Sequence, residues 1–247
     1  MENPFSLSGK TILVTGASSG IGKATAMLCA RMGASVIVTG RNTERLQSVF
    51  DALPGDGHQI IIADLTNASQ RTRLVEDVPP LDGIAYCAGI GHRKPSKFLT
   101  EDDIALVMNA NFNAAVLLQA ALTSAKKIRQ GASLVFLSSK TADIPTTANA
   151  LYSASKGALI SYAKCLALEL APRRIRVNCI CPAMVWTPLV LSDGVTEEEL
   201  KEREARYPLK RYGRPEDIAN LAVFLLSDAS SWMTGSCIDI TGGAIEI

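Results

Sequence analysis

The stretch "TGASSGIG", residues 15–22, decides how the rest of this chain is interpreted. It follows the apolar run "TILV" (11–14), which is typical of a β-strand, and precedes the helical pattern "KATAMLCARM" (23–32). Glycines suit such a turn because it needs positive φ, because a pyrophosphate needs close backbone approach, and because the helix must pack on the strand. Free N–H groups and the helix dipole then favour phosphate. The stretch predicts a dinucleotide-binding turn, with a merely tight turn as the alternative.

Short apolar runs alternate with helical patterns along the whole chain. The apolar runs are near-continuously hydrophobic, as expected of strands covered on both faces. Such alternation predicts right-handed βαβ units and a parallel sheet. We therefore expect one domain over residues 1–247, an α/β doubly wound Rossmann fold with a seven-stranded parallel sheet and helices on both faces. The predicted strands are 11–15, 35–39, 59–63, 83–87, 133–137, 176–180 and 237–241, and the predicted helices are 20–32, 43–52, 67–77, 101–127, 151–171 and 215–228.

Helix-start signals agree with this alternation. Thr43 is placed to cap the second predicted helix, and Pro215 stands at the first position of the last one. In the longest connection between the last two strands, Thr196 and Glu199 predict a capping box. That connection should therefore contain a short helix of its own.

The composition is that of a globular chain without charge bias. Hydrophobic residues make up 47% and charged residues 20%, which argues against disorder. The net charge of +1 gives no reason to expect nucleic acid or an anionic membrane as partner. The N-terminus lacks a secretory signal pattern, and the apolar run "LAVFLL" (221–226) is too short to span a bilayer. We expect a cytoplasmic protein with no membrane partner.

The cysteines are expected to be buried thiols. Most lie inside apolar runs, where cysteine behaves as a small hydrophobe, and Cys179 and Cys181 would share one face of a strand. A metal site would need further ligands nearby, but His58 and His92 are far away in the sequence. Free thiols suggest a reducing compartment. The cysteines are residues 29, 87, 165, 179, 181 and 237.

The glycine spacing resembles a known family signature. The phrase Thr-Gly-x3-Gly-Ile-Gly at 15–22 is similar to that of the classical branch of the short-chain dehydrogenase/reductase family, and the similarity runs from about residue 8 to about residue 243. The resemblance implies a homotetramer (or homodimer). Its first interface would be built by the helices near 101–127 and 151–171, and the last strand would contribute to a second.

The end of the second predicted strand, "VIVTGRN" (36–42), indicates which dinucleotide binds. An acid there accepts hydrogen bonds from the 2′-hydroxyl of NAD, and family members that prefer NAD carry Asp where this chain has Gly40. Arg41 follows, and a guanidinium suits a 2′-phosphate. We expect NADP(H) to be preferred and NAD(H) to be possible, unless Arg41 is only a solvated loop charge. Ser18 and Ser19 are placed to add hydroxyl donors to the phosphates.

Three further segments match family segments that contact the cofactor. They are "ADL" (63–65), which meets the adenine, "CAG" (87–89), and "PAMVWT" (182–187), which meets the nicotinamide carboxamide. Two positions depart from the family, since Cys87 replaces an Asn and Ala183 replaces a Gly. Ala183 cannot easily take positive φ, so the loop would differ if that conformation were needed. The implied cofactor-binding residues are Gly16, Ser18, Ser19, Gly20, Ile21, Gly22, Arg41, Asp64, Leu65, Cys87, Ala88, Gly89, Tyr152, Lys156, Pro182, Val185 and Thr187.

Tyr152 and Lys156, in "YSASKGAL" (152–159), carry the predicted acid–base chemistry. Four positions apart on a helix, they share one face. A phenol with its ordinary pKa of about 10 is a poor base near neutrality, and lowering that pKa to about 7 takes roughly 4 kcal/mol. A nearby ammonium favours the phenolate. The pair alone is a common pattern, and an amphipathic helix with a surface lysine is the plain alternative.

Two more residues in register make the pair more specific. Ser139 ends the fifth predicted strand 13 residues before Tyr152, and Asn111 lies on the preceding long helix, as in the family. The resemblance implies that Tyr152 transfers the proton and that Lys156 binds the nicotinamide ribose and tunes Tyr152. It further implies that Ser139 bonds the substrate oxygen and that Asn111 holds a water linking Lys156 to a proton relay. Ser138 is the rival for the serine role, although the spacing favours Ser139. Neither serine lies in the Gly-x-Ser-x-Gly pattern of hydrolases.

These residues predict an NADP(H)-dependent oxidoreductase that interconverts a ketone or aldehyde with an alcohol by hydride transfer. A 3-oxoacyl-thioester (acyl carrier protein) reductase is the alternative, because the tail 213–243 resembles such members of the family, although Thr241 replaces their usual Asp. A non-catalytic dinucleotide-sensing protein is the alternative of another class. The substrate would be a small molecule, partly apolar if the apolar side chains of 186–212 contact it and do not merely pack the loop. The basic segment 91–97 would meet an anionic substrate or be a solvated loop.

Overall fold

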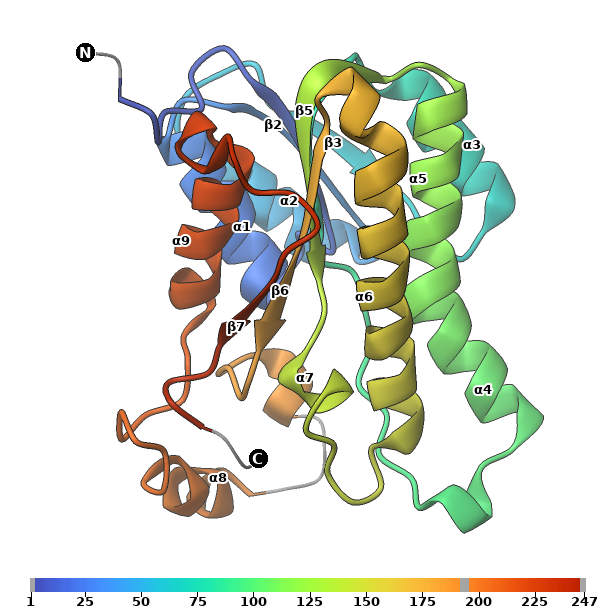
Figure 1. The fold of residues 1–247 in the computed structure, drawn as a ribbon, viewed down its shortest axis with the longest axis vertical. Helices are drawn as coiled ribbons and strands as arrows, with labels where there is room; N and C mark the ends of the chain where they lie inside the picture. Colours follow the sequence, from blue (N-terminus) through green and yellow to red (C-terminus); the bar gives the residue numbers. More distant parts are fainter. Residues whose placement is uncertain (1–2, 192–195, 245–247) are drawn as a thin grey trace.

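A seven-stranded parallel sheet with helices on both faces forms the centre of the protein (Figure 1). The computed structural model describes residues 3–191 and 196–244. The strand order is β3-β2-β1-β4-β5-β6-β7, so it reverses between β1 and β4. All seven predicted strands and the doubly wound fold are confirmed. The strands are β1 (Thr11–Thr15), β2 (Ser35–Gly40), β3 (Gln59–Ile62), β4 (Leu81–Tyr86), β5 (Ile128–Leu137), β6 (Arg176–Pro182) and β7 (Cys237–Ile240).

The helices divide into two layers. Helices α1, α2 and α9 cover one face of the sheet, and α3, α5 and α6 cover the other (Figure 1). The predicted helix 101–127 is interrupted, because a π turn at Asn109–Asn113 separates α4 from α5. The α-helices are α1 (Gly20–Arg31), α2 (Thr43–Asp51), α3 (Ala68–Asp77), α4 (Glu101–Met108), α5 (Ala114–Ser124), α6 (Ala150–Leu170), α7 (Pro188–Leu191), α8 (Glu197–Glu204) and α9 (Pro215–Leu226).

The central strands are apolar on both sides because each side contacts a different helix layer. In β1, Ile12 and Val14 belong to the core under α1 and α9, whereas Leu13 belongs to the core under α5 and α6. All three side chains are fully buried. The alternation of faces along a strand therefore produces a continuous hydrophobic run in the sequence.

Two of the three predicted helix starts are confirmed. Pro215 is the first residue of α9, and Thr196 forms a capping box with Glu199 at the start of α8. The prediction for Thr43 is wrong, because Asn42 caps α2 through a 2.8 Å bond from the Arg45 N–H to Asn42 Oδ1. Asn42 still has extended backbone, as a capping residue requires, whereas Thr43 is already helical.

The expectation that the cysteines are buried holds for some of them and not for others. Cys29, Cys179 and Cys181 are buried, and the last two share the core cluster under α6. Cys165 and Cys237 are exposed, so the expectation is wrong for them, because each lies on an outward face of its element. All six thiols are free, and the described residues contain no group of ligating side chains that could hold a metal ion.

The helical segment Glu101–Ser124, which includes α4, the π turn and α5, is long and apolar enough to cross a membrane by length and composition alone. One side of it packs on the sheet through Leu118 and Leu122. Core helices of globular proteins commonly have this length and apolar composition, so the segment is weak evidence for a membrane. Its other side leaves Leu106 and Leu117 exposed.

Candidate functional site

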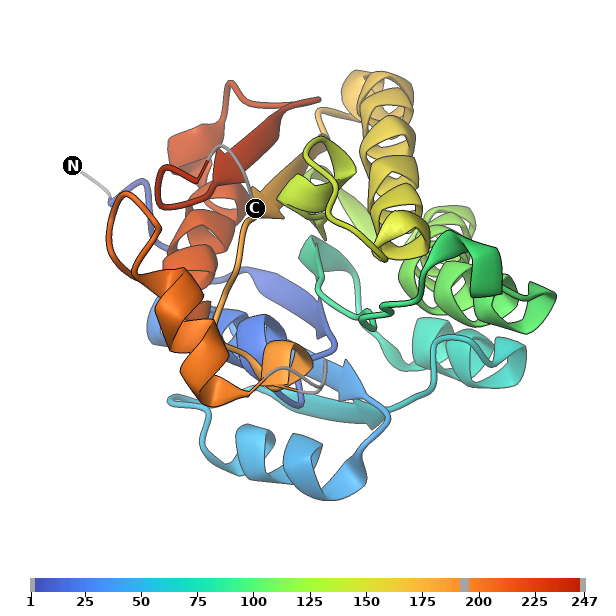
Figure 2. The ribbon, with the colours of Figure 1, turned by 90° about the horizontal axis from the view of Figure 1, so that it is seen from below.

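A cavity of about 390 Å³ lies at the carboxyl ends of the strands, where the strand order reverses between β1 and β4. In open α/β sheets this is where ligands bind. Figure 2 views the molecule from this end, with α7 and α8 near the viewer. The predicted cofactor-binding residues that line the cavity are Gly16, Ser18, Ser19, Gly20, Ile21, Gly22, Arg41, Asp64, Leu65, Cys87, Ala88, Gly89 and Thr187.

Backbone packing explains the glycines of the β1–α1 turn. Gly16 has φ +65°, and a Cβ there would lie 2.7 Å from the Cα of Ala88. A Cβ on Gly22 would clash with the carbonyl oxygen of Gly16. Neither position has room for a side chain, so the turn presents bare backbone and the start of α1 to the cavity. That cradle fits a pyrophosphate.

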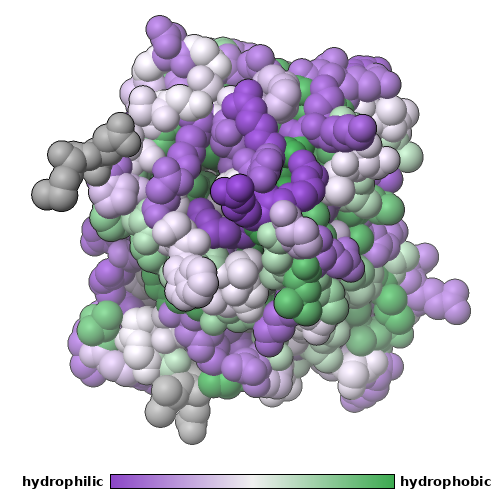
Figure 3. Space-filling view, turned by 45° about the horizontal axis from the view of Figure 1, so that its top comes forward, coloured by the Kyte–Doolittle hydropathy of each residue, from purple (hydrophilic) through white to green (hydrophobic). Residues whose placement is uncertain are grey.

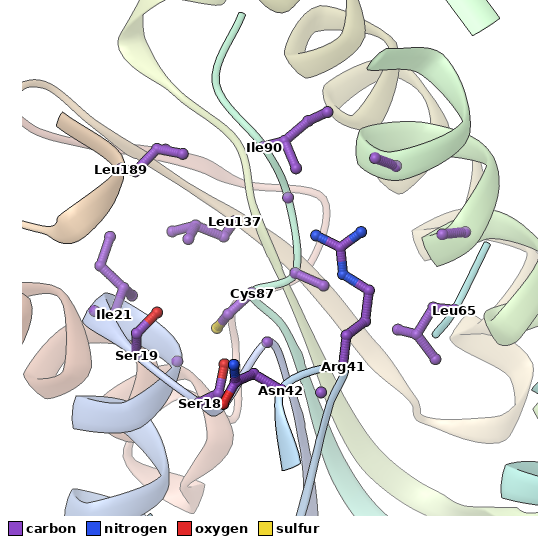
Figure 4. A pocket seen from close by; sticks show the side chains of 18 of the residues that line it. Ser18, Ser19, Ile21, Arg41, Asn42, Leu65, Cys87, Ile90, Leu137 and Leu189 are labelled. Carbon is purple, nitrogen blue, oxygen red and sulfur yellow. The ribbon is translucent and has the colours of Figure 1, made fainter. Parts of the chain in front are cut away.

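Arg41 marks one end of this cavity. Figure 4 shows its guanidinium reaching across the space between Leu65 and Cys87. Arg45, one turn into α2, also lines the cavity and was missed by the sequence analysis. Its signal was a second arginine in the first turn of the helix that follows Arg41, at the same end of the sheet. Together the two guanidiniums make this end of the cavity positive.

Asp64 lines the same cavity as Arg41. Partial burial would raise the pKa of its carboxyl, but hydrogen bonds from the N–H and hydroxyl of Thr66, together with the charge of Arg41, hold that pKa below its usual value. Asp64 is therefore an ionised acceptor within reach of a ligand in the cavity. Its own N–H donates to Gln70 Oε1 at 2.7 Å, which fixes the turn.

A second cavity, of about 150 Å³, adjoins the first and shares Ile21, Cys87 and Thr187 with it. It brings together most of the residues selected from the sequence for chemistry. Of the predicted catalytic residues, Asn111 alone is not among the residues that line it. The predicted residues that line this cavity are Ile21, Cys87, Gly89, Ser138, Ser139, Tyr152, Lys156, Pro182, Val185 and Thr187.

Helix α6 places Lys156 beneath Tyr152. The Lys156 Nζ lies 5.7 Å from the centroid of the Tyr152 ring and donates a 2.8 Å hydrogen bond to the carbonyl oxygen of Leu137. Burial lowers the pKa of Lys156 to about 8, although neighbouring thiols including Cys87 oppose that shift. The ammonium is therefore close enough to favour the phenolate of Tyr152 near neutral pH.

The hydrogen bonds of the two serines distinguish their possible roles. Ser138 donates to the carbonyl oxygen of Lys156 at 2.8 Å, so its proton is committed to α6. Ser139 Oγ instead accepts bonds from the N–H and the hydroxyl of Thr141, at 3.2 and 2.9 Å. Because both bonds are accepted, the Ser139 proton is available for a substrate oxygen.

Asn111 lies in the π turn, and its side chain joins two parts of the site. Its Oδ1 accepts from the N–H of Ile90 at 2.7 Å, and its Nδ2 donates to the Ile90 carbonyl at 3.0 Å and to Ser155 Oγ at 3.1 Å. Because the side-chain amide of Asn111 is engaged in these bonds, a water that links to Lys156 would bind the main-chain carbonyl oxygen of Asn111. That role stays a prediction.

Two departures from the family pattern leave the local backbone intact. The hydroxyl of Thr15 accepts from the N–H groups of Cys87 and Ala88 at 3.1 and 3.2 Å, so this turn is held without an Asn side chain. Ala183 does not have positive φ and donates its N–H to the Ile240 carbonyl at 3.2 Å. The replacement of glycine there needs no strained backbone.

Some side chains of the segment 186–212 pack against one another within the loop, and others line the cavity. Trp186 and Tyr207 pack in a small cluster with Tyr212, and Trp186 Nε1 donates to Glu204 Oε1 at 2.9 Å. Leu189 and Val190 line the 150 Å³ cavity. Residues 192–195 lie outside the described part of the chain.

A parallel doubly wound sheet with a glycine-lined cavity at its reversal point defines a dinucleotide-binding α/β protein. The family model described as enoyl-(acyl carrier protein) reductase matches residues 16–244. The 3-oxoacyl-(acyl-carrier-protein) reductase of Rickettsia felis is 34% identical, over 98% of this chain and 99% of that protein. A tropinone reductase homolog of Arabidopsis thaliana is 34% identical, over 97% of this chain and 91% of that protein.

Solved structures agree with these relatives. A structure from Beutenbergia cavernae, assigned to an NAD(P)-dependent gluconate 5-dehydrogenase and holding NADP at low occupancy, has a TM-score of 0.88, 32% identity and 98% coverage of both chains. The present chain belongs to the short-chain dehydrogenase/reductase family, in its 3-oxoacyl-carrier-protein-reductase-like branch. It is an oxidoreductase acting on CH–OH groups with a nicotinamide dinucleotide.

Proposed function

We propose that the protein is an NADP(H)-dependent oxidoreductase that interconverts a ketone or aldehyde with an alcohol, with Tyr152 as the acid/base. The observation that carries this proposal is that Ser139, Tyr152 and Lys156 line one cavity that adjoins the glycine-lined cavity. The whole chain acts as one domain, and segment 186–212 contributes the variable wall of the substrate site.

When bound, the nicotinamide supplies or accepts the hydride. Ser139 donates a hydrogen bond to the substrate oxygen, keeps its proton, and stabilises negative charge that develops there. Tyr152 gives a proton to that oxygen in the reducing direction and removes it in the oxidising direction. Lys156 keeps its charge beside Tyr152 below a pH of about 8 and so holds the phenol ready to ionise.

The preference for NADP(H) rests on charge at the adenosine end. Arg41 and Arg45 line that end of the cavity, and Gly40 supplies no carboxylate. A 2′-phosphate gains charge-assisted hydrogen bonds from guanidinium groups, whereas the hydroxyls of NAD(H) gain less. NAD(H) is expected to bind more weakly and still to support turnover.

A 3-oxoacyl-thioester reductase is the second candidate. It is favoured because several relatives, including those of Rickettsia felis and Thermotoga maritima, are named as 3-oxoacyl-(acyl-carrier-protein) reductases. Leu189 and Val190 would give an acyl chain an apolar wall. The ketone reduction itself would use the same Ser139, Tyr152 and Lys156.

The assembly we propose is a homotetramer (or homodimer) in the cytoplasm. Exposed leucines on three helices support it, namely Leu106 on α4, Leu117 on α5 and Leu168 on α6. In Figure 3, hydrophobic residues are more frequent towards the lower right, the side on which α5 and α6 lie in Figure 1. The free thiols support a reducing compartment.

The decisive experiment is a spectrophotometric screen of NADPH and NADH oxidation with ketones, aldehydes and 3-oxoacyl thioesters. The wild type should reduce at least one carbonyl class, with NADPH favoured. Tyr152→Phe should lose at least about 100-fold in kcat while keeping nucleotide affinity, because it lacks only the phenolic proton. Turnover retained in Tyr152→Phe would refute the assigned role.

A further inference from the structure

His92 lies on the loop after β4 and lines the 150 Å³ cavity beside Ser139 and Tyr152. In the sequence, His92 was considered as a metal ligand and as part of the basic segment 91–97. Its loop is tied on the opposite side by the Lys94 N–H, which donates to the Ala148 carbonyl at 2.8 Å. The imidazole is part of the cavity wall, and its side chain is only 13% exposed.

One ring nitrogen of His92 is committed to a carboxylate. Nε2 lies 3.1 Å from Asp103 Oδ1, while the other Asp103 oxygen accepts from Lys94 Nζ at 2.6 Å and from the Thr100 hydroxyl at 2.8 Å. These bonds, that from Lys94 first, hold the pKa of Asp103 well below its usual range. Because an ionised carboxylate only accepts, Nε2 must carry the hydrogen.

The other nitrogen, Nδ1, then carries a lone pair in the neutral ring. It is buried and has no hydrogen-bond partner among the described residues. A buried polar atom left without a partner costs free energy because it has lost its hydrogen bonds to water. Such an atom in the wall of a ligand cavity is expected to find its partner in the ligand.

We propose that His92 accepts a hydrogen bond from a hydroxyl group of the substrate, so that the preferred substrates are hydroxylated ketones. Because Nδ1 is buried in the unliganded cavity, the proposal requires the ring to shift when the substrate binds, and Asp103 fixes its tautomer. This proposal rests on the proposed carbonyl–alcohol activity and adds a substrate class to it. Simple alkyl ketones and unsubstituted acyl chains lack the group that His92 would recognise.

A kinetic comparison tests the proposal with matched ketones. 4-Hydroxy-2-butanone and 1-hydroxy-2-butanone carry a hydroxyl at two distances from the carbonyl, and 2-butanone carries none. We expect His92→Phe to lower kcat/KM about tenfold for at least one hydroxyketone and to leave 2-butanone within about threefold. His92→Asn, whose amide oxygen stands near the position of Nδ1, should restore most of the loss. His58→Phe, the matched change at the histidine that lines neither cavity, should leave the ratio unchanged.

Equal losses for all three ketones in His92→Phe would overturn the inference while leaving the proposed function intact. No turnover of any carbonyl by the wild type would instead count against the proposed function, and a second measurement then decides about His92. In protein labelled with 15N-histidine and saturated with NADP+, the hydroxyketones should shift the Nδ1 resonance of His92, and 2-butanone should not. The His58 signal is the internal control, and an unchanged His92 resonance would overturn the inference.

Discussion

At the scale of a single residue, Lys156 has to keep a positive charge in a buried position, and these two requirements conflict. Its charge must persist beside Tyr152, yet the side chain is buried, and burial lowers its pKa to about 8. A single bond to the Leu137 carbonyl compensates only part of the lost hydration. The protein therefore sacrifices stability at this position for the chemistry of the neighbouring phenol.

This conflict predicts a pH-dependent difference in stability. Between pH 8 and 10.5 the unfolded chain still holds the Lys156 proton that the folded chain has released, so the wild type gains stability as pH rises. Lys156→Met lacks this proton. Relative to Lys156→Met, the wild type should gain roughly 3 kcal/mol in unfolding free energy between pH 7 and pH 10.5. Urea unfolding at several pH values checks this, and parallel pH curves for the two proteins would contradict it.

Gly40 gives a second prediction at this scale. A Cβ there would meet Leu46 and Ser18 at ordinary contact distances of 3.6 Å, so a side chain fits. Gly40→Asp should shift the ratio of kcat/KM for NADH over NADPH upward by roughly 10- to 100-fold, because a carboxylate accepts from ribose hydroxyls and repels a 2′-phosphate. Gly40→Asn is the neutral control of equal size. An equal shift in both variants would show that shape, and not charge, selects the cofactor.

At the scale of elements, the β1–α1 turn depends on contact between two stretches of backbone. Gly22→Ala would place a methyl group against the Gly16 carbonyl, so the turn must open. We expect a loss of about 1–3 kcal/mol in unfolding free energy together with weaker nucleotide binding. Gly157→Ala in α6 is the matched control, since a Cβ there meets nothing within 4 Å. That control should gain up to about 1 kcal/mol from helix propensity, and a similar loss in both variants would contradict the explanation.

The elements that the sequence predicted best are those whose pattern is set by burial. β1 was predicted with its observed bounds because both of its faces contact helices. The π turn at Asn109–Asn113 could not be predicted, because its cause is the tertiary bonding of Asn111 to Ile90 and Ser155. The cap of α2 was misplaced by one residue, since both Asn42 and Thr43 suit that role by composition.

The residues of the candidate site that belong to a sequence motif could be predicted, and the others could not. Tyr152, Lys156 and Ser139 line one cavity as their spacing suggested. The contribution of His92 depends on Asp103, 11 positions away on another element, and no sequence pattern joins the two. The spacing to Tyr152 favoured Ser139 over Ser138, and the hydrogen-bond partners of the two serines, which the sequence does not show, support the same choice.

At the scale of the whole molecule, the unpaired apolar surface of the helix layer formed by α4, α5 and α6 remains to be explained. Leu117 is 47% exposed and Leu168 is 79% exposed, although neither lines a cavity. Clustered exposed leucines are costly in water unless another surface covers them. The proposed homo-oligomer would supply that surface from a second copy of the same helices.

This proposal predicts that charge on these helices separates the subunits. The double variant Leu117→Asp with Leu168→Asp should lower the mass in size-exclusion chromatography with light scattering, because burying unpaired charges of the same sign costs several kcal/mol. Ile62→Asp is the control, since Ile62 is 48% exposed on β3, at the opposite edge of the sheet from β7. The control should keep the wild-type mass. A wild type that already runs at the 26.3 kDa of one chain would rule out the oligomer.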